Sequence, residues 1–377
     1  MQYIPFGSLG FDVSRFGIGA MRLPTKSKKI DEEQAIEMIR YGIDHGVNYI
    51  DTAWPYHSQQ SEPLVARALA NGYREQVKLA TKSPVWLCEQ YEDYEKYLDE
   101  QLERLHTDCI DFYLLHALNK ERWKKHKEMG CLRFLDEMVK KGKIKYPSFS
   151  FHDDYDTFID ILDSYDWKMA QIQLNLLDED NQATVKGLKY AGQKGIPIVV
   201  MEPIKGGKLA LDDNPAVRSI YDRYPEKRSS VEWAFRWLYR FPEVTTIISG
   251  VSNLDQLKEN LEIFDRVDMS PLSEKEQDIY HQVQEYYRRR SRVDCTDCRY
   301  CVPCPQGVSI PDIFAQYNDS YMYDDFGWPV GNYKGMMSKG SGADECIECG
   351  VCESQCPQHI EIMEKLKEAH EWLTQEQ

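Results

Sequence analysis

The sequence has no long run of apolar residues, no cleavable secretory signal and no extended basic stretch. A membrane-spanning helix needs about 20 consecutive, largely apolar residues, and no segment provides them. We therefore expect a cytoplasmic protein that is neither secreted nor inserted in a membrane. The one short basic cluster is Arg288-Arg289-Arg290, and the net charge is −16. Because lysine and arginine contacts to phosphates supply most of the affinity for nucleic acid, we expect no nucleic-acid partner.

The sequence also lacks the Gly-x-Gly-x-x-Gly pattern that opens the dinucleotide site of a doubly wound sheet. The hydrophobic content of 42% and the aromatic content of 12% are ordinary for a globular protein. A length of 377 residues leaves room for one large domain and a smaller one.

Eight short, mostly apolar segments alternate with amphipathic stretches of helical periodicity. Strands that are apolar throughout are typical of a sheet covered on both faces. Eight strand–helix units over about 250 residues predict a (β/α)8 TIM barrel, and a doubly wound sheet is the disfavoured alternative. The predicted strands are residues 16–21, 47–52, 77–81, 110–115, 144–150, 170–174, 196–201 and 245–249. The predicted helices include residues 31–45, 61–69, 91–105, 132–141 and 181–194.

Two further segments complete the predicted barrel domain. Residues 1–15 carry two turn signals between short apolar pieces, which predicts an N-terminal hairpin. Residues 208–231 are long and polar, so they form either a loop over the substrate or a connecting helix and turn.

Four polar side chains lie just past three successive predicted strands. They are Asp51, Tyr56, Lys82 and His116. In a parallel barrel, the carboxyl ends of the strands meet on the face where chemistry is done. A phenol titrates near pH 10, so it is a useful acid at neutral pH only if its anion is stabilised. A buried ammonium held charged by a carboxylate provides that stabilisation, and a histidine beside the phenol can orient a carbonyl oxygen.

The motifs DTAWPY, LATK and DFYLLH, in this order and spacing, resemble the aldo-keto reductase superfamily over roughly residues 1–265. The resemblance implies a TIM barrel plugged by the N-terminal hairpin, and NAD(P)H-dependent reduction of a small-molecule carbonyl substrate. By matched position, Tyr56 is the general acid and Asp51, Lys82 and His116 are its partners. The alternative is that Asp51 and Lys82 form an ordinary ion pair while Tyr56 packs against the barrel.

The resemblance also implies the nucleotide contacts. Ser150 and Gln171 match residues that contact the nicotinamide carboxamide, and Met201 replaces an aromatic residue that stacks on the nicotinamide. The turn at 249–253 opens a helix whose N-terminus can receive a phosphate. Gly250 and Gln256 stand where NADPH-specific members have cations, which favours NADH or dual use unless Lys258 compensates. The expected cofactor-binding residues are Ser150, Gln171, Met201, Pro203, Ile204, Gly250, Ser252, Gln256, Glu259 and Asn260.

Eight of the eleven cysteines lie between residues 295 and 356, in two runs of regular spacing. The second run, Cys-x2-Cys-x2-Cys-x3-Cys-Pro, has the spacing of bacterial ferredoxin clusters, and the first run is one residue shorter before its last cysteine. Structural zinc is the alternative, but such sites typically use two separated pairs. The predicted cluster ligands are Cys295, Cys298, Cys301, Cys304, Cys346, Cys349, Cys352 and Cys356.

We expect two 4Fe-4S clusters with crossed ligation, in which the fourth cysteine of each run serves the other cluster. A single cluster on the second run is the alternative. The expected domains are a barrel at 1–270, a linking helix at 271–292 and a ferredoxin-like domain at 293–377. The residues between the two runs are rich in aromatic side chains and form either a packing surface or a surface for a partner.

The sequence therefore predicts an oxidoreductase that transfers hydride between NAD(P)H and a carbonyl or alcohol substrate. The clusters would serve electron transfer, with a redox partner protein, or would serve structure. The alternative is an electron-transfer or redox-sensing iron–sulfur protein that uses the barrel as a scaffold. Nicotinamide moves two electrons as hydride and each cluster moves one, so coupling the two normally needs a flavin, which no motif signals.

Overall fold

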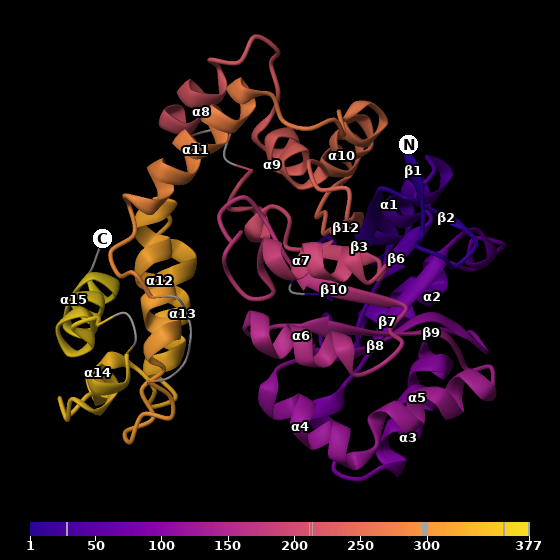
Figure 1. The fold of residues 1–377 in the computed structure, drawn as a ribbon, viewed down its shortest axis with the longest axis horizontal. Coiled ribbons are helices and arrows are strands. Elements are labelled where there is room, and N and C mark those ends of the chain that lie inside the picture. Colours follow the sequence, from indigo (N-terminus) through magenta and orange to yellow (C-terminus); the bar gives the residue numbers. More distant parts are fainter. Residues whose placement is uncertain (28, 211, 213, 296–300, 357–358, 376–377) are drawn as a thin grey trace. The chain divides into compact units, whose positions relative to one another are not determined.

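The computed structural model describes residues 1–377 except 28, 211, 213, 296–300, 357–358 and 376–377. The chain divides into two compact units, which Figure 1 colours along the sequence. Unit 1 comprises Met1–Asn214 and Pro225–Glu274, and unit 2 comprises Pro215–Tyr224 and Lys275–Gln377. The short segment Pro215–Tyr224, which the sequence placed within the barrel domain, thus belongs to the C-terminal unit.

Unit 1 is a closed barrel of eight parallel strands, as predicted. The neighbour order is β10-β11-β12-β3-β6-β7-β8-β9. Every predicted strand is present, with small shifts at its ends. The barrel strands are β3 (Phe16–Gly19), β6 (Tyr49–Asp51), β7 (Lys78–Ser83), β8 (Ile110–Leu118), β9 (Ile144–Phe151), β10 (Met169–Gln173), β11 (Ile198–Met201) and β12 (Val244–Ser249).

The helices of unit 1 follow the strands in the chain, and their ends agree with the capping signals. Asp31 caps the first helix by accepting a hydrogen bond from the Gln34 amide, and the chain leaves that helix through Gly46 at φ +97°. The helices are α1 (Glu32–Asp44), α2 (Ser61–Ala68), α3 (Glu92–Arg104), α4 (Lys120–Met129), α5 (Cys131–Lys140), α6 (Tyr155–Asp163), α7 (Thr184–Gln193), α9 (Ser230–Tyr239) and α10 (Leu254–Arg266).

The predicted N-terminal hairpin closes one end of the barrel. Its strands β1 (Tyr3–Pro5) and β2 (Asp12–Ser14) pair antiparallel. The Phe6 side chain is fully buried in a cluster with residues of the barrel strands, among them Tyr49 and Phe112. A second small hairpin, β4 (Thr25–Lys26) with β5 (Lys29–Ile30), lies where the sequence carries no strand pattern.

The polar segment 208–231 divides between the two expected roles. Its first part continues a loop that contains the short 3-10 helix at Lys205–Gly207. It then forms α8 (Pro215–Tyr221) in unit 2 and returns to unit 1 at α9.

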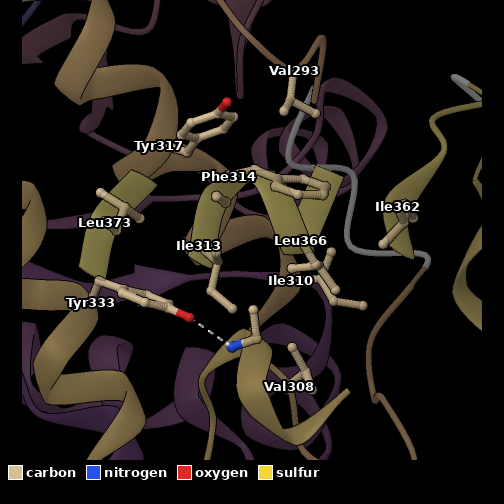
Figure 2. Packing of buried hydrophobic residues seen from close by; sticks show 12 residues of the cluster. Val293, Val308, Ile310, Ile313, Phe314, Tyr317, Tyr333, Ile362, Leu366 and Leu373 are labelled. Atoms are coloured by element: carbon tan, nitrogen blue, oxygen red, sulfur yellow. Dashed lines mark hydrogen bonds between the residues drawn. The ribbon is translucent and has the colours of Figure 1, made fainter. Parts of the chain in front are cut away.

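Unit 2 is helical and has its own core. Its helices are α8, α11 (Glu274–Arg288), α12 (Ile310–Met322), α13 (Gly327–Met337), α14 (Val351–Gln355) and α15 (Ile362–Thr374). Side chains of α12, α13 and α15, including Ile313, Tyr333 and Leu366, form one buried cluster (Figure 2). The aromatic insert between the cysteine runs therefore supplies much of this core. None of the helices among the described residues is long and apolar enough to span a membrane.

Candidate active site

The four predicted catalytic residues come together at the carboxyl ends of three adjacent strands. Asp51 is the last residue of β6, and Lys82 and His116 lie near the ends of β7 and β8. The Lys82 ammonium donates hydrogen bonds to Asp51 Oδ1 at 2.5 Å, to the Thr52 carbonyl at 2.8 Å and to the Tyr56 hydroxyl oxygen at 3.3 Å. The side chains of Lys82 and Asp51 are each 1% exposed. The arrangement joins carboxylate, ammonium and phenol in a single buried chain of contacts.

Burial and charge set the protonation states of this chain. Burial raises the pKa of Tyr56, and the Lys82 charge opposes that rise without cancelling it. Burial by itself lowers the pKa of Lys82, but Asp51 and Tyr56 raise it, and the net direction is upward. The phenol is therefore protonated at neutral pH and the ammonium beside it remains charged.

His116 faces the phenol as a neutral imidazole. Its ring centroid lies 6.2 Å from that of Tyr56, with the two planes at 80°. Burial, followed by the charges of Lys82 and of neighbouring basic side chains, holds the pKa of His116 well below its usual range. Its Nδ1 is buried and has no hydrogen-bond partner among the described residues. An imidazole in this state can hydrogen-bond a carbonyl oxygen placed beside Tyr56.

One cavity of about 760 Å³ connects these residues with all of the predicted nucleotide contacts. Gln171 and Ser150 lie on adjacent strands, paired in register across β9 and β10. The cavity is lined by the predicted residues Asp51, Tyr56, Lys82, His116, Ser150, Gln171, Met201, Pro203, Ile204, Gly250, Ser252, Gln256, Glu259 and Asn260. Such a size is typical of a cofactor or small-molecule site.

Polar atoms with no protein partner line the middle of the cavity. Gln171 donates weakly to Asp51 Oδ2 at 3.4 Å, while its Oε1 is buried and has no partner within the described part of the chain. Ser249 Oγ is also buried and has no hydrogen-bond partner within the described part of the chain. Ser150 Oγ accepts the Ala117 amide at 2.8 Å, so its own proton is available. A buried polar group left unpaired costs about 1–3 kcal/mol, so a carboxamide that pairs with these groups fits here.

The other end of the cavity lies at the start of α10. Asn253 caps this helix by accepting from the Gln256 amide at 2.9 Å. The Gln256 side chain turns back and accepts hydrogen bonds from the Ser252 amide and hydroxyl, at 2.9 and 3.1 Å. Lys258 does not line the cavity, and its ammonium lies 5.7 Å from the ring of Tyr41. Neither side chain therefore provides a cation inside the cavity.

A cation that sequence reasoning missed is Arg22, which follows β3 and lines the cavity. A Cβ at Gly250 would lie 2.9 Å from the Cβ of Arg22, and a Cβ at Gly206 would lie 2.9 Å from its Nη2. The guanidinium pairs with Glu202 at 3.4 Å. Gly250 thus leaves room for the stem of the Arg22 side chain, whereas a Cβ at Gly206 would displace only its movable end. An exposed arginine after a strand carries no periodic signal, which is why the sequence did not single it out.

In unit 2, four of the predicted cluster ligands line one pocket, together with apolar residues such as Val308 and Leu366. These cysteines are Cys304, Cys346, Cys349 and Cys352. Three further ligands, Cys295, Cys301 and Cys356, pack against the same core, and Cys298 lies outside the described residues.

The described residues contain no group of three His, Cys, Asp or Glu side chains that would hold a single metal ion. A cubane differs from a single ion because it takes each cysteine on a different iron, so its thiolates lie further apart. The four thiol side chains and the otherwise largely apolar lining of the pocket fit an iron–sulfur cluster.

The comparisons with known proteins address both parts of the chain. The model of the aldo/keto reductase family matches residues 15–283, and the model of a 4Fe-4S dicluster domain matches residues 294–361. An uncharacterized oxidoreductase of Bacillus subtilis, YqkF, is 26% identical over 301 residues, which covers 70% of this chain and 90% of the relative. A probable aldo-keto reductase of Glycine max is 25% identical over 296 residues, covering 69% of this chain and 84% of that protein.

Solved structures support the fold. The holo form of the aldo-keto reductase AKR11C1 from Bacillus halodurans matches with a TM-score of 0.63 and 24% identity, over 75% of this chain and 96% of that one. An aldo-keto reductase from Klebsiella pneumoniae, solved in complex with NADPH, matches with a TM-score of 0.61 and 21% identity, over 75% and 95%. Since one family model spans most of the chain, this protein belongs to the aldo-keto reductase family of oxidoreductases and carries a C-terminal 4Fe-4S dicluster domain.

Proposed function

We propose that this protein reduces the carbonyl group of a small molecule with NADH or NADPH, and that Tyr56 supplies the proton. The observation that carries the proposal is the position of the Lys82 ammonium, which bonds both Asp51 and the Tyr56 hydroxyl inside the cavity. A purely structural ion pair between Asp51 and Lys82 would not require a phenol hydroxyl hydrogen-bonded to the ammonium.

The residues in the middle of the cavity suit a nicotinamide. Gln171 Oε1 can accept from a carboxamide N–H, and the Ser150 hydroxyl can donate to its carbonyl oxygen. Met201, half-buried at the end of β11, offers a polarisable surface on which a ring face can pack. Bound there, the reduced nicotinamide supplies hydride to the carbonyl carbon.

Residues of the protein would donate the proton to the substrate and stabilise the anion that remains. The Tyr56 hydroxyl donates its proton to the carbonyl oxygen as negative charge develops there. Lys82 stabilises the phenolate that remains, because its ammonium is held charged by Asp51. His116 hydrogen-bonds the same oxygen and so orients the substrate.

Transfer of a deuterium label tests this proposal. Anaerobically purified protein would be given an aldehyde and NADH or NADPH deuterated at the transferred position of C4. The proposal predicts one deuterium on the carbinol carbon for each nucleotide oxidised, read by mass spectrometry of the alcohol. Oxidation of the nucleotide without label in the alcohol would contradict it and would favour an electron-transfer protein built on a barrel scaffold.

For unit 2 we propose two 4Fe-4S clusters with crossed ligation. The set Cys304, Cys346, Cys349 and Cys352 lines one pocket, and this is the crossed set rather than either run alone. Cys295, Cys298, Cys301 and Cys356 would hold the other cluster. When bound to either set of four cysteines, a cluster would supply one-electron redox chemistry or a covalent link between distant segments.

The iron–sulfur unit leaves two roles open, electron exchange with a redox partner protein and structural support. Six of the eight cysteines pack against the core of unit 2, which favours a structural contribution because the core of such a small unit is limited in size. They are Cys295, Cys301, Cys304, Cys346, Cys352 and Cys356. We propose that the clusters stabilise unit 2 whether or not they also exchange electrons with a partner protein.

A further inference from the structure

Arg122 lies beside the catalytic histidine, outside the predicted set of site residues. It sits in the first turn of α4, directly after β8, where Asn119 caps the helix by accepting from the Arg122 amide at 2.8 Å. Its Nη1 donates to the carbonyl of Ala117, the residue after His116, at 2.7 Å. The side chain is half-buried. The guanidinium is thus tied to the end of the strand that carries His116.

Trp86 connects the guanidinium with the imidazole. The indole lies in the short 3-10 helix after β7, and its ring centroid is 5.2 Å from that of His116. The Arg122 Cζ is 5.6 Å from the centroid of the Trp86 ring. His116, Trp86 and Arg122 therefore follow one another outward from Tyr56. His116 lines the cavity, whereas Trp86 and Arg122 lie beyond its lining residues, as a half-buried indole and a cation.

No acidic side chain neutralises Arg122 in the part of the chain that is described. Its guanidinium makes no ion pair there, and Nη1 alone has a hydrogen-bond acceptor. Two acidic residues that line the cavity pair with other cations, since Asp51 binds Lys82 and Glu202 binds Arg22. Arg122 is thus a cation near His116 with no ion-pair partner among the described residues, and its charge contributes to the lowered pKa of that imidazole.

We propose that Arg122 binds a carboxylate on the substrate, at the end of an apolar body that lies along Trp86 and carries the reacting carbonyl at Tyr56 and His116. The proposal rests on the carbonyl reduction proposed above and names its substrate class, the oxo acids whose carbonyl and carboxylate are separated by an apolar spacer. A guanidinium suits this role because its fork of N–H groups matches a carboxylate and because it is always charged. The charge of Arg122 would also attract such an anion toward the site.

The test compares two aldehydes of nearly equal shape, 4-carboxybenzaldehyde and its neutral methyl ester. The measured quantity is the ratio of kcat/KM for the acid to that for the ester, because intrinsic reactivity cancels when the ratio is compared between variants. In Arg122→Met the ratio should fall about 10- to 100-fold, the range expected for losing hydrogen bonds to a charged group. Arg122→Lys should retain part of the preference for the acid over the ester. A ratio in Arg122→Met within about two-fold of wild type would overturn the proposal.

Lys124→Met is the matched control. Lys124 is exposed on the same helix, two residues further and about 200° around its axis, so the variant removes an equal charge from α4 away from Trp86. The ratio of kcat/KM for the acid to that for the ester should be the same in Lys124→Met as in wild type. An equal fall in Lys124→Met would show that net charge alone produces the effect and would also overturn the proposal.

A binding measurement separates this inference from the proposed function. Calorimetric titration of 4-(hydroxymethyl)benzoate into protein saturated with oxidised nucleotide needs no turnover. Affinity that falls at least ten-fold in Arg122→Met supports the carboxylate site, even if the protein reduces neither aldehyde and the reductase proposal fails. Equal affinity in wild type and Arg122→Met would overturn the site while leaving the reductase proposal intact.

Discussion

The Nζ atom of Lys82 lies 3.3 Å from the hydroxyl oxygen of Tyr56, on the side of the phenol that faces Asp51. The contact joins a group whose pKa burial raises to a group that stays charged because a carboxylate lies 2.5 Å away. A phenol in this position is a proton donor at neutral pH whose conjugate base has a ready counter-ion.

Replacing Lys82 by Met should affect activity and stability together. Loss of the ammonium raises the pKa of Tyr56 further and should lower kcat by about 10²–10⁴-fold. It also leaves Asp51 buried without a counter-ion, which costs about 3–5 kcal/mol in the free energy of unfolding. The double variant Asp51→Asn, Lys82→Met should regain stability in urea denaturation without regaining activity. Single-variant activity within a few-fold of wild type would refute the role of Lys82.

The pH dependence should differ between the two reaction directions. Reduction needs the protonated phenol, and a raised pKa keeps Tyr56 protonated at every pH below about 10, so kcat for reduction should be flat through neutral pH. Oxidation of the alcohol needs the phenolate and should accelerate as pH rises. Because the pKa of His116 is well below its usual range, neither profile should show a limb near pH 6.5. A limb there, absent from His116→Ala, would show that the imidazole titrates.

The end of the cavity at the start of α10, where we propose that the adenosine part of the nucleotide binds, predicts no strong preference for NADPH. Gln256 bonds the turn at Ser252 rather than reaching outward, and Gly250 has no side chain. Gln256→Arg should supply a cation for the 2′-phosphate and tighten NADPH relative to NADH by about 10-fold or more. Fluorescence titration of wild type and variant gives the two dissociation constants. A wild-type preference for NADPH that Arg22→Met abolishes would instead assign the phosphate to Arg22.

Iron analysis tests the two-cluster proposal. Anaerobically purified protein should contain about eight irons and eight sulfides per chain by the logic of two cubanes. Cys304→Ser should change the electron paramagnetic resonance signal of the cluster built on the second run, although Cys304 belongs to the first. Cys109→Ser, in the barrel and outside both runs, is the control and should leave iron content and signal unchanged. About four irons per chain in wild type would reject the second cluster.

The barrel and its site could be predicted because both depend on local sequence patterns. Apolar segments such as 110–115 are recognisable alone, and the polar residue after each strand, such as His116, must lie at the common face once the sheet closes. The positions of Asp51 and Lys82 follow from that geometry.

The features that were missed depend on contacts between distant segments. The α4 helix that carries Arg122 is mostly polar, so it shows little amphipathic pattern. Arg22 has room for its side chain because Gly250, far away in the sequence, has no Cβ. The grouping of Pro215–Tyr224 with unit 2 likewise follows from packing rather than from a break in composition.

The most direct test is single-turnover reduction of 4-carboxybenzaldehyde by wild type and by Tyr56→Phe. The variant removes the hydroxyl group that donates the proton and keeps the ring, so it should bind NADH and NADPH as wild type does while its rate of nucleotide oxidation falls by about 10²–10⁴-fold. Fluorescence titration establishes the binding, and absorbance at 340 nm follows the turnover. Oxidation by Tyr56→Phe at a rate within a few-fold of wild type would contradict the assignment of Tyr56 as the proton donor.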